Sequence, residues 1–158
     1  MFRSAEQAIR FAFRVRGKAV MSRMRFEEYA ISGGAATDRL TAYDFHAMSG
    51  MVFSIISRQA DLEQAVCFLV YGEPHEKQVA AKLIAEAENV QLPKHLKTRG
   101  DLAKALLSKS VRECSRECGV SHYKAWRVRQ SAWGIVEPYL IRLHECIESR
   151  LKLDDAGN

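Results

Sequence analysis

The sequence predicts an all-α protein that forms a compact domain of several helices. Apolar residues recur three and four positions apart along almost all of the 158 residues. No stretch shows the sustained alternation of a β-strand with Gly-rich hairpin turns. Gly and Pro number only 9 and 3, and 47% of the residues are apolar. A chain of this length and composition buries enough surface to fold without disulfides or a metal.

The first 40 residues are predicted to form a basic helix followed by a mobile Gly-rich loop. Ser4 and Gln7 have the spacing of a capping box, which predicts a helix that runs to about Arg16. Gly17 is expected to weaken or end this helix. The segment 31–38, ISGGAATD, is rich in small and polar residues that gain little from burial, so we expect a mobile loop there.

Residues 41–158 are predicted to form one helical domain. Gly72 is expected to cap the C-terminal end of one helix, and Pro74 fits the first turn of the next. Pro138, with Gly134 four residues earlier, is expected to kink or split the long C-terminal helix. The predicted starts of the helices before residue 110 in this domain are Thr41 (with Asp44 three residues later), Asp61, Pro74 and Asp101.

The segment 110–130 has the pattern of a helix-turn-helix. Gly119 would supply the turn, where a positive φ is expected and glycine adopts it freely. Ser121 would cap the second helix by accepting a backbone N–H bond. The side chains expected on the inner side of the motif are Cys114, Ser115, Cys118, Val120, Ala125 and Val128.

The outward side chains of this motif predict DNA binding. In a DNA-reading helix-turn-helix the second helix enters the major groove, where Lys and Arg contact phosphates while His, Tyr and Arg contact base edges. Trp126 could either face the DNA or pack beneath the helix. The predicted DNA-binding residues are Ser121, His122, Tyr123, Lys124, Arg127 and Arg129, with Arg116 in the first helix and Arg14 in the N-terminal segment.

The charge of the chain, +5 in total, is divided into blocks. Residues 1–26 hold seven Lys and Arg against one Glu, and residues 94–130 hold ten against three acidic residues. Residues 27–93, by contrast, hold four basic and ten acidic residues. Two basic blocks predict a polyanionic partner. The N-terminal block itself could be a helix with solvated arginines, a second nucleic-acid contact or a membrane-surface helix.

The segment 110–129, followed by a further helix, resembles the sigma-region-four type of helix-turn-helix found in small phage regulators. The wider layout of residues 41–152 is similar to the phage late-gene antitermination protein Q family, in the helix AMSGMVFSIISR, the segment 61–72 and the motif SVRECSRECGVSHYKAW. The resemblance implies a protein that binds DNA near a late promoter, joins a paused RNA polymerase and makes it read through terminators. The sequence therefore predicts a double-stranded DNA-binding transcription regulator of phage or prophage type, with antitermination as the preferred function.

Several alternatives share the same motif. A repressor, an activator or a DNA-packaging recognition subunit could use it on DNA, and a sigma-like or polymerase-binding adaptor could use it for protein contact alone. Salt dependence separates the last case, because only DNA binding is strongly weakened by added salt. The C-terminal helix has apolar residues to spare, including Trp133 or Leu140, that could form a homodimer interface.

Metal binding and catalysis are not expected from the side-chain pattern. Cys114, Cys118 and His122 follow one another at intervals of four, like ligands on one helix, but a glycine interrupts that helix and no second Cys/His pair has zinc spacing. Asp44 and His46 lie two apart, so a helix directs them to different faces. The sequence has no nucleotide-binding glycine loop. We therefore expect core thiols, no cofactor and no enzyme activity.

The expected location is the cytoplasm, with reduced cysteines. The longest apolar run, 65–71, has seven residues, far short of the ~20 that a membrane span requires. The first residues move directly into a charged amphipathic pattern, unlike a secretory signal. Four cysteines within helical patterns do not resemble a secreted disulfide framework.

Overall fold

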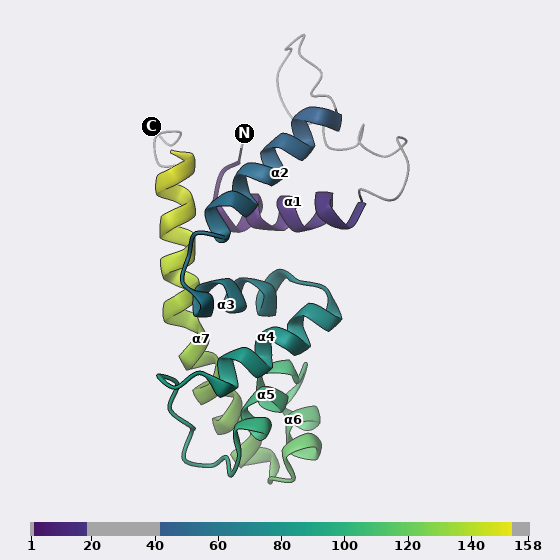
Figure 1. Ribbon diagram of the computed structural model, residues 1–158. Coiled ribbons are helices and arrows are strands. Elements are labelled where there is room, and N and C mark those ends of the chain that lie inside the picture. The colour runs from purple at the N-terminus through teal and green to yellow at the C-terminus, as the bar shows by residue number, and fades with distance from the viewer. Residues whose placement is uncertain (1, 19–41, 153–158) are drawn as a thin grey trace. The chain divides into compact units, whose positions relative to one another are not determined.

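The computed structural model describes residues 2–18 and 42–152, and all regular structure in these ranges is α-helical (Figure 1). The all-α prediction is confirmed. The expected loop at 31–38 and the expected cap at Thr41 lie outside the described residues. The helices are α1 (Ala5–Lys18), α2 (Ala42–Ile56), α3 (Asp61–Tyr71), α4 (Pro74–Glu86), α5 (Arg99–Leu107), α6 (Val111–Cys118) and α7 (His122–Leu151).

The helices belong to two compact units. Unit 1 contains the chain up to Arg58 and from Cys146 onward, and so holds α1, α2 and the end of α7. Unit 2 contains Gln59–Glu145, with α3 to α6 and most of α7. The sequence-based boundary at residue 40 does not coincide with this grouping, because α2 packs against α1.

In unit 1, α1 and α2 pack through their apolar faces. The ring centroids of Phe13 and Phe53 lie 5.1 Å apart. The hydroxyl of Ser49, which is buried, donates a hydrogen bond of 3.1 Å to the carbonyl of Ala12. This side chain therefore finds its partner on the neighbouring helix, as buried polar groups require.

The start of α1 matches the sequence prediction more closely than its end. Ser4 accepts a hydrogen bond from the N–H of Gln7 at 3.3 Å, as a capping residue does. The helix continues to Lys18, so Gly17 does not end it. A glycine inside a helix costs only about 1 kcal/mol. The buried residues earlier in α1 offset that cost.

In unit 2, α3 and α4 meet at a short connection. Gly72 is the C-terminal cap of α3, as predicted, but its φ of −71° is open to any residue. Glycine is needed there for space, because a Cβ would lie 2.4 Å from the carbonyl oxygen of Phe68. Pro74 takes the first position of α4, as predicted, and the Glu76 carboxylate accepts the N–H of Glu73 at 2.8 Å.

α7 is a single helix of 30 residues with Pro138 inside it. Of the predicted kink or split at this proline, the split does not occur, because one helix runs through it. Proline has no N–H to bond the carbonyl of Gly134, but Gly134 is exposed and water can replace that bond. Val136 and Leu143, on either side of Pro138, are fully buried, and their packing keeps the helix in place.

Candidate nucleic-acid interface

The helix α6 is capped at its start and anchored at its middle. The Ser110 hydroxyl accepts the N–H of Glu113 at 3.1 Å, and the Glu113 carboxylate accepts the N–H of Lys109 at 2.7 Å. Cys114 is fully buried, as predicted. A helix of only eight residues is marginal by itself, so these caps and this buried side chain hold it.

The turn between α6 and α7 is fixed by one glycine and one serine. Gly119 has φ 63° and ψ 34°, which confirms the predicted positive φ. The carbonyl of Ser115 accepts the N–H groups of both Gly119 and Val120. The Ser115 hydroxyl donates a bond of 2.6 Å to the carbonyl of Val120. Val120 packs against the core, as predicted, so the turn is held on both sides.

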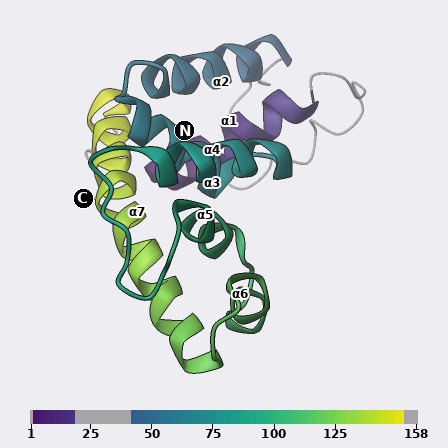
Figure 2. The same ribbon diagram turned by 60° about the horizontal axis from the view of Figure 1, so that its bottom comes forward.

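α7 begins at a cap and buries a regular stripe. The carbonyl of Ser121 accepts the N–H of Ala125 at 2.8 Å, and its hydroxyl accepts that of Lys124 at 3.5 Å. Ala125 and Val128 are fully buried, which confirms the predicted inward stripe, and they share one core cluster with Cys114. In both ribbon views α6, the turn and the start of α7 lie at one end of unit 2 (Figure 2).

The outer side of the first turns of α7 carries exposed aromatic and basic side chains. Tyr123 is 62% exposed and Trp126 is 46% exposed, so Trp126 does not pack beneath the helix. The guanidinium of Arg127 lies 5.1 Å from the centre of the Tyr123 ring, a cation–π contact. His122 and Lys124 are exposed beside them. No Asp or Glu occurs between Glu117 and Glu137.

Arg129 lies on a different side of α7 from Arg127. It is half-buried, and its Nε atom is buried without a hydrogen-bond partner among the described residues. An α-helix turns about 100° per residue, so Arg129 projects about 160° away from Arg127. The structure therefore brings Tyr123 and Arg127 together on the outer side of α7. His122 and Lys124, two residues apart, lie on opposite flanks, and Arg129 lies on the flank of His122.

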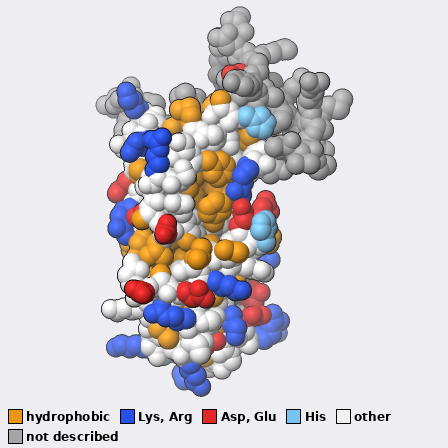
Figure 3. All heavy atoms as spheres, viewed as in Figure 1, with side chains coloured by type: hydrophobic (Ala, Val, Ile, Leu, Met, Phe, Trp, Pro, Cys, Tyr) orange, Lys and Arg blue, Asp and Glu red, His pale blue; other side chains and the backbone are white. Residues whose placement is uncertain are grey.

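α6 contributes basic side chains at the same end of unit 2. The Arg116 side chain is 77% exposed and lies 3.8 Å from the carboxylate of Glu117. Arg112, one turn earlier and also exposed, shares its face. Sequence reasoning missed Arg112, although its spacing of four from Arg116 was a sufficient signal. Figure 3 shows Lys and Arg side chains at the surface over α5 and α6, with Asp and Glu side chains among them.

Part of the basic block 94–130 has a structural role. Nη1 of Arg99 donates to three carbonyls at the end of α4, those of Ala85, Ala87 and Val90, at 2.7, 3.0 and 3.3 Å. Lys104 pairs with Asp101 at 3.4 Å. The number of Lys and Arg residues in the block therefore exceeds the number of basic side chains that are available to bind a polyanion. The exposed basic side chains of the block include those of α6 and the start of α7, and also Lys94, Lys97 and Lys109 between helices.

The thiols of α6 are packing groups. Burial raises the pKa of the Cys118 thiol to about 12, and the neighbouring Cys114 adds to this rise. Cys118 is consequently protonated at neutral pH, and its sulfur donates to the carbonyl of Asp101 at 3.6 Å. A thiolate is the form that binds metals. Among the described residues, no three His, Cys, Asp or Glu side chains are placed to hold a metal ion.

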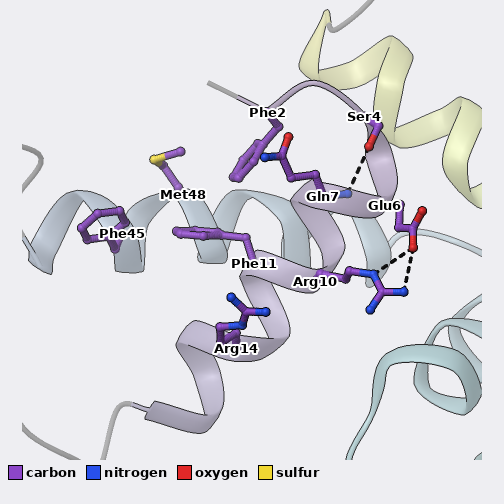
Figure 4. Close-up of a pocket in the computed structure, with 9 residues that line it drawn as sticks. All are labelled: Phe2, Ser4, Glu6, Gln7, Arg10, Phe11, Arg14, Phe45 and Met48. Carbon is purple, nitrogen blue, oxygen red and sulfur yellow. Dashed lines mark hydrogen bonds and ion pairs between the residues drawn. The ribbon is translucent and has the colours of Figure 1, made fainter. Parts of the chain in front are cut away.

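Arg14 lies in unit 1, beside a pocket of about 430 Å³ (Figure 4). The Glu6 carboxylate pairs with Arg10 at 2.7 Å on the wall of this pocket, and Arg14 is exposed on the next turn of α1. Two further members of the N-terminal basic block, Arg23 and Arg25, lie outside the described residues. The apolar lining comes from Phe2, Phe11, Phe45 and Met48.

The apolar residues considered for a homodimer lie along α7. Trp133 and Leu140 are half-buried and pack against the core of unit 2. Ile141 is more exposed, at 50%. Most of the apolar stripe of α7 is therefore used within the chain.

No protein-family model, curated protein sequence or solved structure matches this chain. Within residues 2–18 and 42–152, no helix is long and apolar enough to cross a membrane.

Proposed function

We propose that the chain is a transcription regulator that binds double-stranded DNA through α6, the turn and the first turns of α7, here called the α6–α7 surface. One observation carries the proposal. Over residues 121–129 the two aliphatic side chains that face inward are fully buried, while the exposed side chains are basic, aromatic or polar, with no carboxylate among them. A helix with this division of side chains can lie in the major groove with its basic and aromatic side toward the DNA.

The side chains of the α6–α7 surface would have two roles. Lys124 and Arg116 are exposed point charges suited to phosphates, which position a protein on DNA without reading its sequence. The guanidinium of Arg127 lies against the Tyr123 ring, and no carboxylate among residues 2–18 and 42–152 pairs with it. A guanidinium presented in this way suits the O6 and N7 acceptors of guanine. Sequence preference would therefore depend mainly on Arg127.

The experiment is a selection followed by titration. Duplexes with a random 20-base-pair centre are enriched on the purified full-length protein, and the enriched and random duplexes are compared by fluorescence anisotropy at 50 and 200 mM salt. If about six phosphates are contacted, affinity should fall by on the order of 10³-fold over this range. Arg127→Ala should abolish the preference for enriched DNA.

The matched control is Lys82→Ala, which removes one exposed positive charge from α4, outside the α6–α7 surface. It should leave the binding of both duplexes unchanged. An absence of DNA binding at 50 mM salt would contradict the proposal and favour a protein-contact adaptor.

We further propose RNA polymerase as the partner and terminator readthrough as the outcome. The resemblance of residues 41–152 to the late-gene antitermination family supports this step. The test is transcription by purified polymerase from a template that carries an enriched site between a promoter and a terminator. An increased ratio of readthrough to terminated transcript is expected. A change in total transcript at a constant ratio would identify a repressor or activator instead.

A further inference from the structure

An open apolar groove lies between α3 and α4 in unit 2. Its volume is about 690 Å³, and the buried Ala65 and Ala80 lie among the residues that line it. Val79 and Leu83, one turn apart along α4, are 58% and 56% exposed. Figure 3 shows hydrophobic side chains at the surface over α3 and α4, with Asp and Glu beside them. The two exposed aliphatic side chains on the edge of the groove leave apolar surface that a partner could cover.

The carboxylate and amine side chains that line this groove are all of one sign. Asp61, which is exposed, and Glu76 both line it, and none of the lining residues is Lys or Arg. Together the two helices hold four acidic residues, Asp61, Glu63, Glu76 and Glu86, against two basic ones, Lys77 and Lys82. A partner that covers this apolar surface would therefore gain from positive charges along its edges and be repelled if it carried negative ones.

We infer that the groove binds an amphipathic α-helix of a partner protein that carries Lys or Arg on both sides of its apolar stripe. A groove between two helices accepts the apolar side chains of a third at i, i+3, i+4 and i+7. Val79 and Leu83 have the spacing to pack between such side chains, while Asp61 and Glu76 would pair with the flanking cations. The α6–α7 surface takes no part in this interaction.

Synthetic peptides test the inference directly. The full-length protein is titrated into three fluorescein-labelled 18-residue peptides. The first has Leu at helical spacing with Lys between, the second replaces every Lys by Glu, and the third has the composition of the first in scrambled order. The first should bind at least tenfold more tightly than the other two. Equal binding of the scrambled peptide would show attraction by charge alone and overturn the inference.

Variants locate the binding. Leu83→Ser and Val79→Ser should each weaken binding of the Leu/Lys peptide about five- to tenfold, because each removes the exposed part of one apolar side chain. Asp61→Asn should weaken it about threefold, since it removes one rim charge. Gln78→Ala, on the same helix but outside the groove, should leave it unchanged. Since all four residues are exposed, circular dichroism should show retained helicity.

Two further outcomes would overturn the inference. One is unchanged peptide affinity in the Leu83→Ser and Val79→Ser variants. The other is a dimer of the protein alone, seen by sedimentation, that Leu83→Ser converts to a monomer, because a second copy would then occupy the groove.

Discussion

The hydroxyl of Ser115 donates a hydrogen bond of 2.6 Å to the carbonyl oxygen of Val120, across the turn that joins α6 to α7. The backbone carbonyl of the same serine accepts the N–H groups of Gly119 and Val120. Three hydrogen bonds therefore converge on one residue in the last turn of α6. They set the direction in which the chain enters α7.

Replacement of Ser115 by Ala is expected to lower the free energy of unfolding by about 1 kcal/mol, because the Val120 carbonyl loses its side-chain donor. Urea denaturation followed by circular dichroism measures the change. Ser131→Ala, at an exposed position of α7, is the control and should alter stability by less than about 0.5 kcal/mol. Equal stabilities of the two variants would mean that the short bond contributes nothing.

Two glycine-to-alanine replacements should change the free energy of unfolding in opposite directions. Gly119→Ala should destabilise the protein by about 1–2 kcal/mol, because alanine must adopt a φ of 63° although its Cβ would meet no atom within 4 Å. Gly134→Ala, also in open space but inside α7, should stabilise it by about 0.5–1 kcal/mol. Thermal melting of both variants tests the pair. The explanation fails if Gly119→Ala is neutral.

Asp101 makes stability depend on pH. The side-chain hydrogen bond with Thr98 lowers the pKa of this carboxyl below its usual 3.8, with a smaller contribution from Lys104. Its stabilising effect is therefore fully present above the unfolded-state pKa and is lost as pH falls through the folded-state pKa. Asp101→Asn should be less stable than the original chain at pH 7, and the gap should close below about pH 4. Urea titrations at several pH values measure the difference in stability between the two proteins. A difference that persists at acid pH would contradict this role of Asp101.

Tyr123 should matter for DNA recognition through its ring. Tyr123→Phe keeps the contact with Arg127 and is expected to retain most of the preference for enriched DNA, whereas Tyr123→Leu should lose it by several-fold. Anisotropy titrations with enriched and random duplexes separate the effects. If Phe and Leu behave alike, the ring does not orient Arg127.

Replacement of Arg14 and replacement of Arg127 are expected to change DNA binding in different ways. Arg14→Ala should weaken binding to enriched and random duplexes by the same factor, as loss of a phosphate contact does, and reduce the salt slope by about one. Arg127→Ala should in addition remove the preference between them. Equal effects of the two variants on both duplexes would contradict this division.

The features that the sequence predicted well depend on neighbours along the chain. Ser4, Ser121 and Gly119 act on backbone groups within a few residues, so their roles follow from local spacing. The direction of the Arg129 side chain could also have been predicted, because the helical spacing that buries Ala125 and Val128 fixes the direction of Arg129 as well.

Features that depend on long-range packing could not be predicted. The role of the Ser115 hydroxyl could not be predicted, because its partner, the Val120 carbonyl, lies on the other side of the turn and its position depends on the shape of that turn. The pairing of α2 with α1 and the groove beside Val79 depend on which apolar faces meet. The 3.6-residue period shows that such faces exist but does not say which partner each one takes.

Unit 1 is built from two parts of the chain that lie far apart in sequence. The N–H of Ala5, at the start of α1, donates to the Glu148 carboxylate at 3.2 Å, and Ile147 beside that carboxylate is fully buried. Because synthesis proceeds from the N-terminus, α1 and α2 are made first, but unit 1 also needs this last part of α7. The contiguous unit 2 ends three residues before Glu148. Along the chain, the unit that begins first is therefore the one that is completed last.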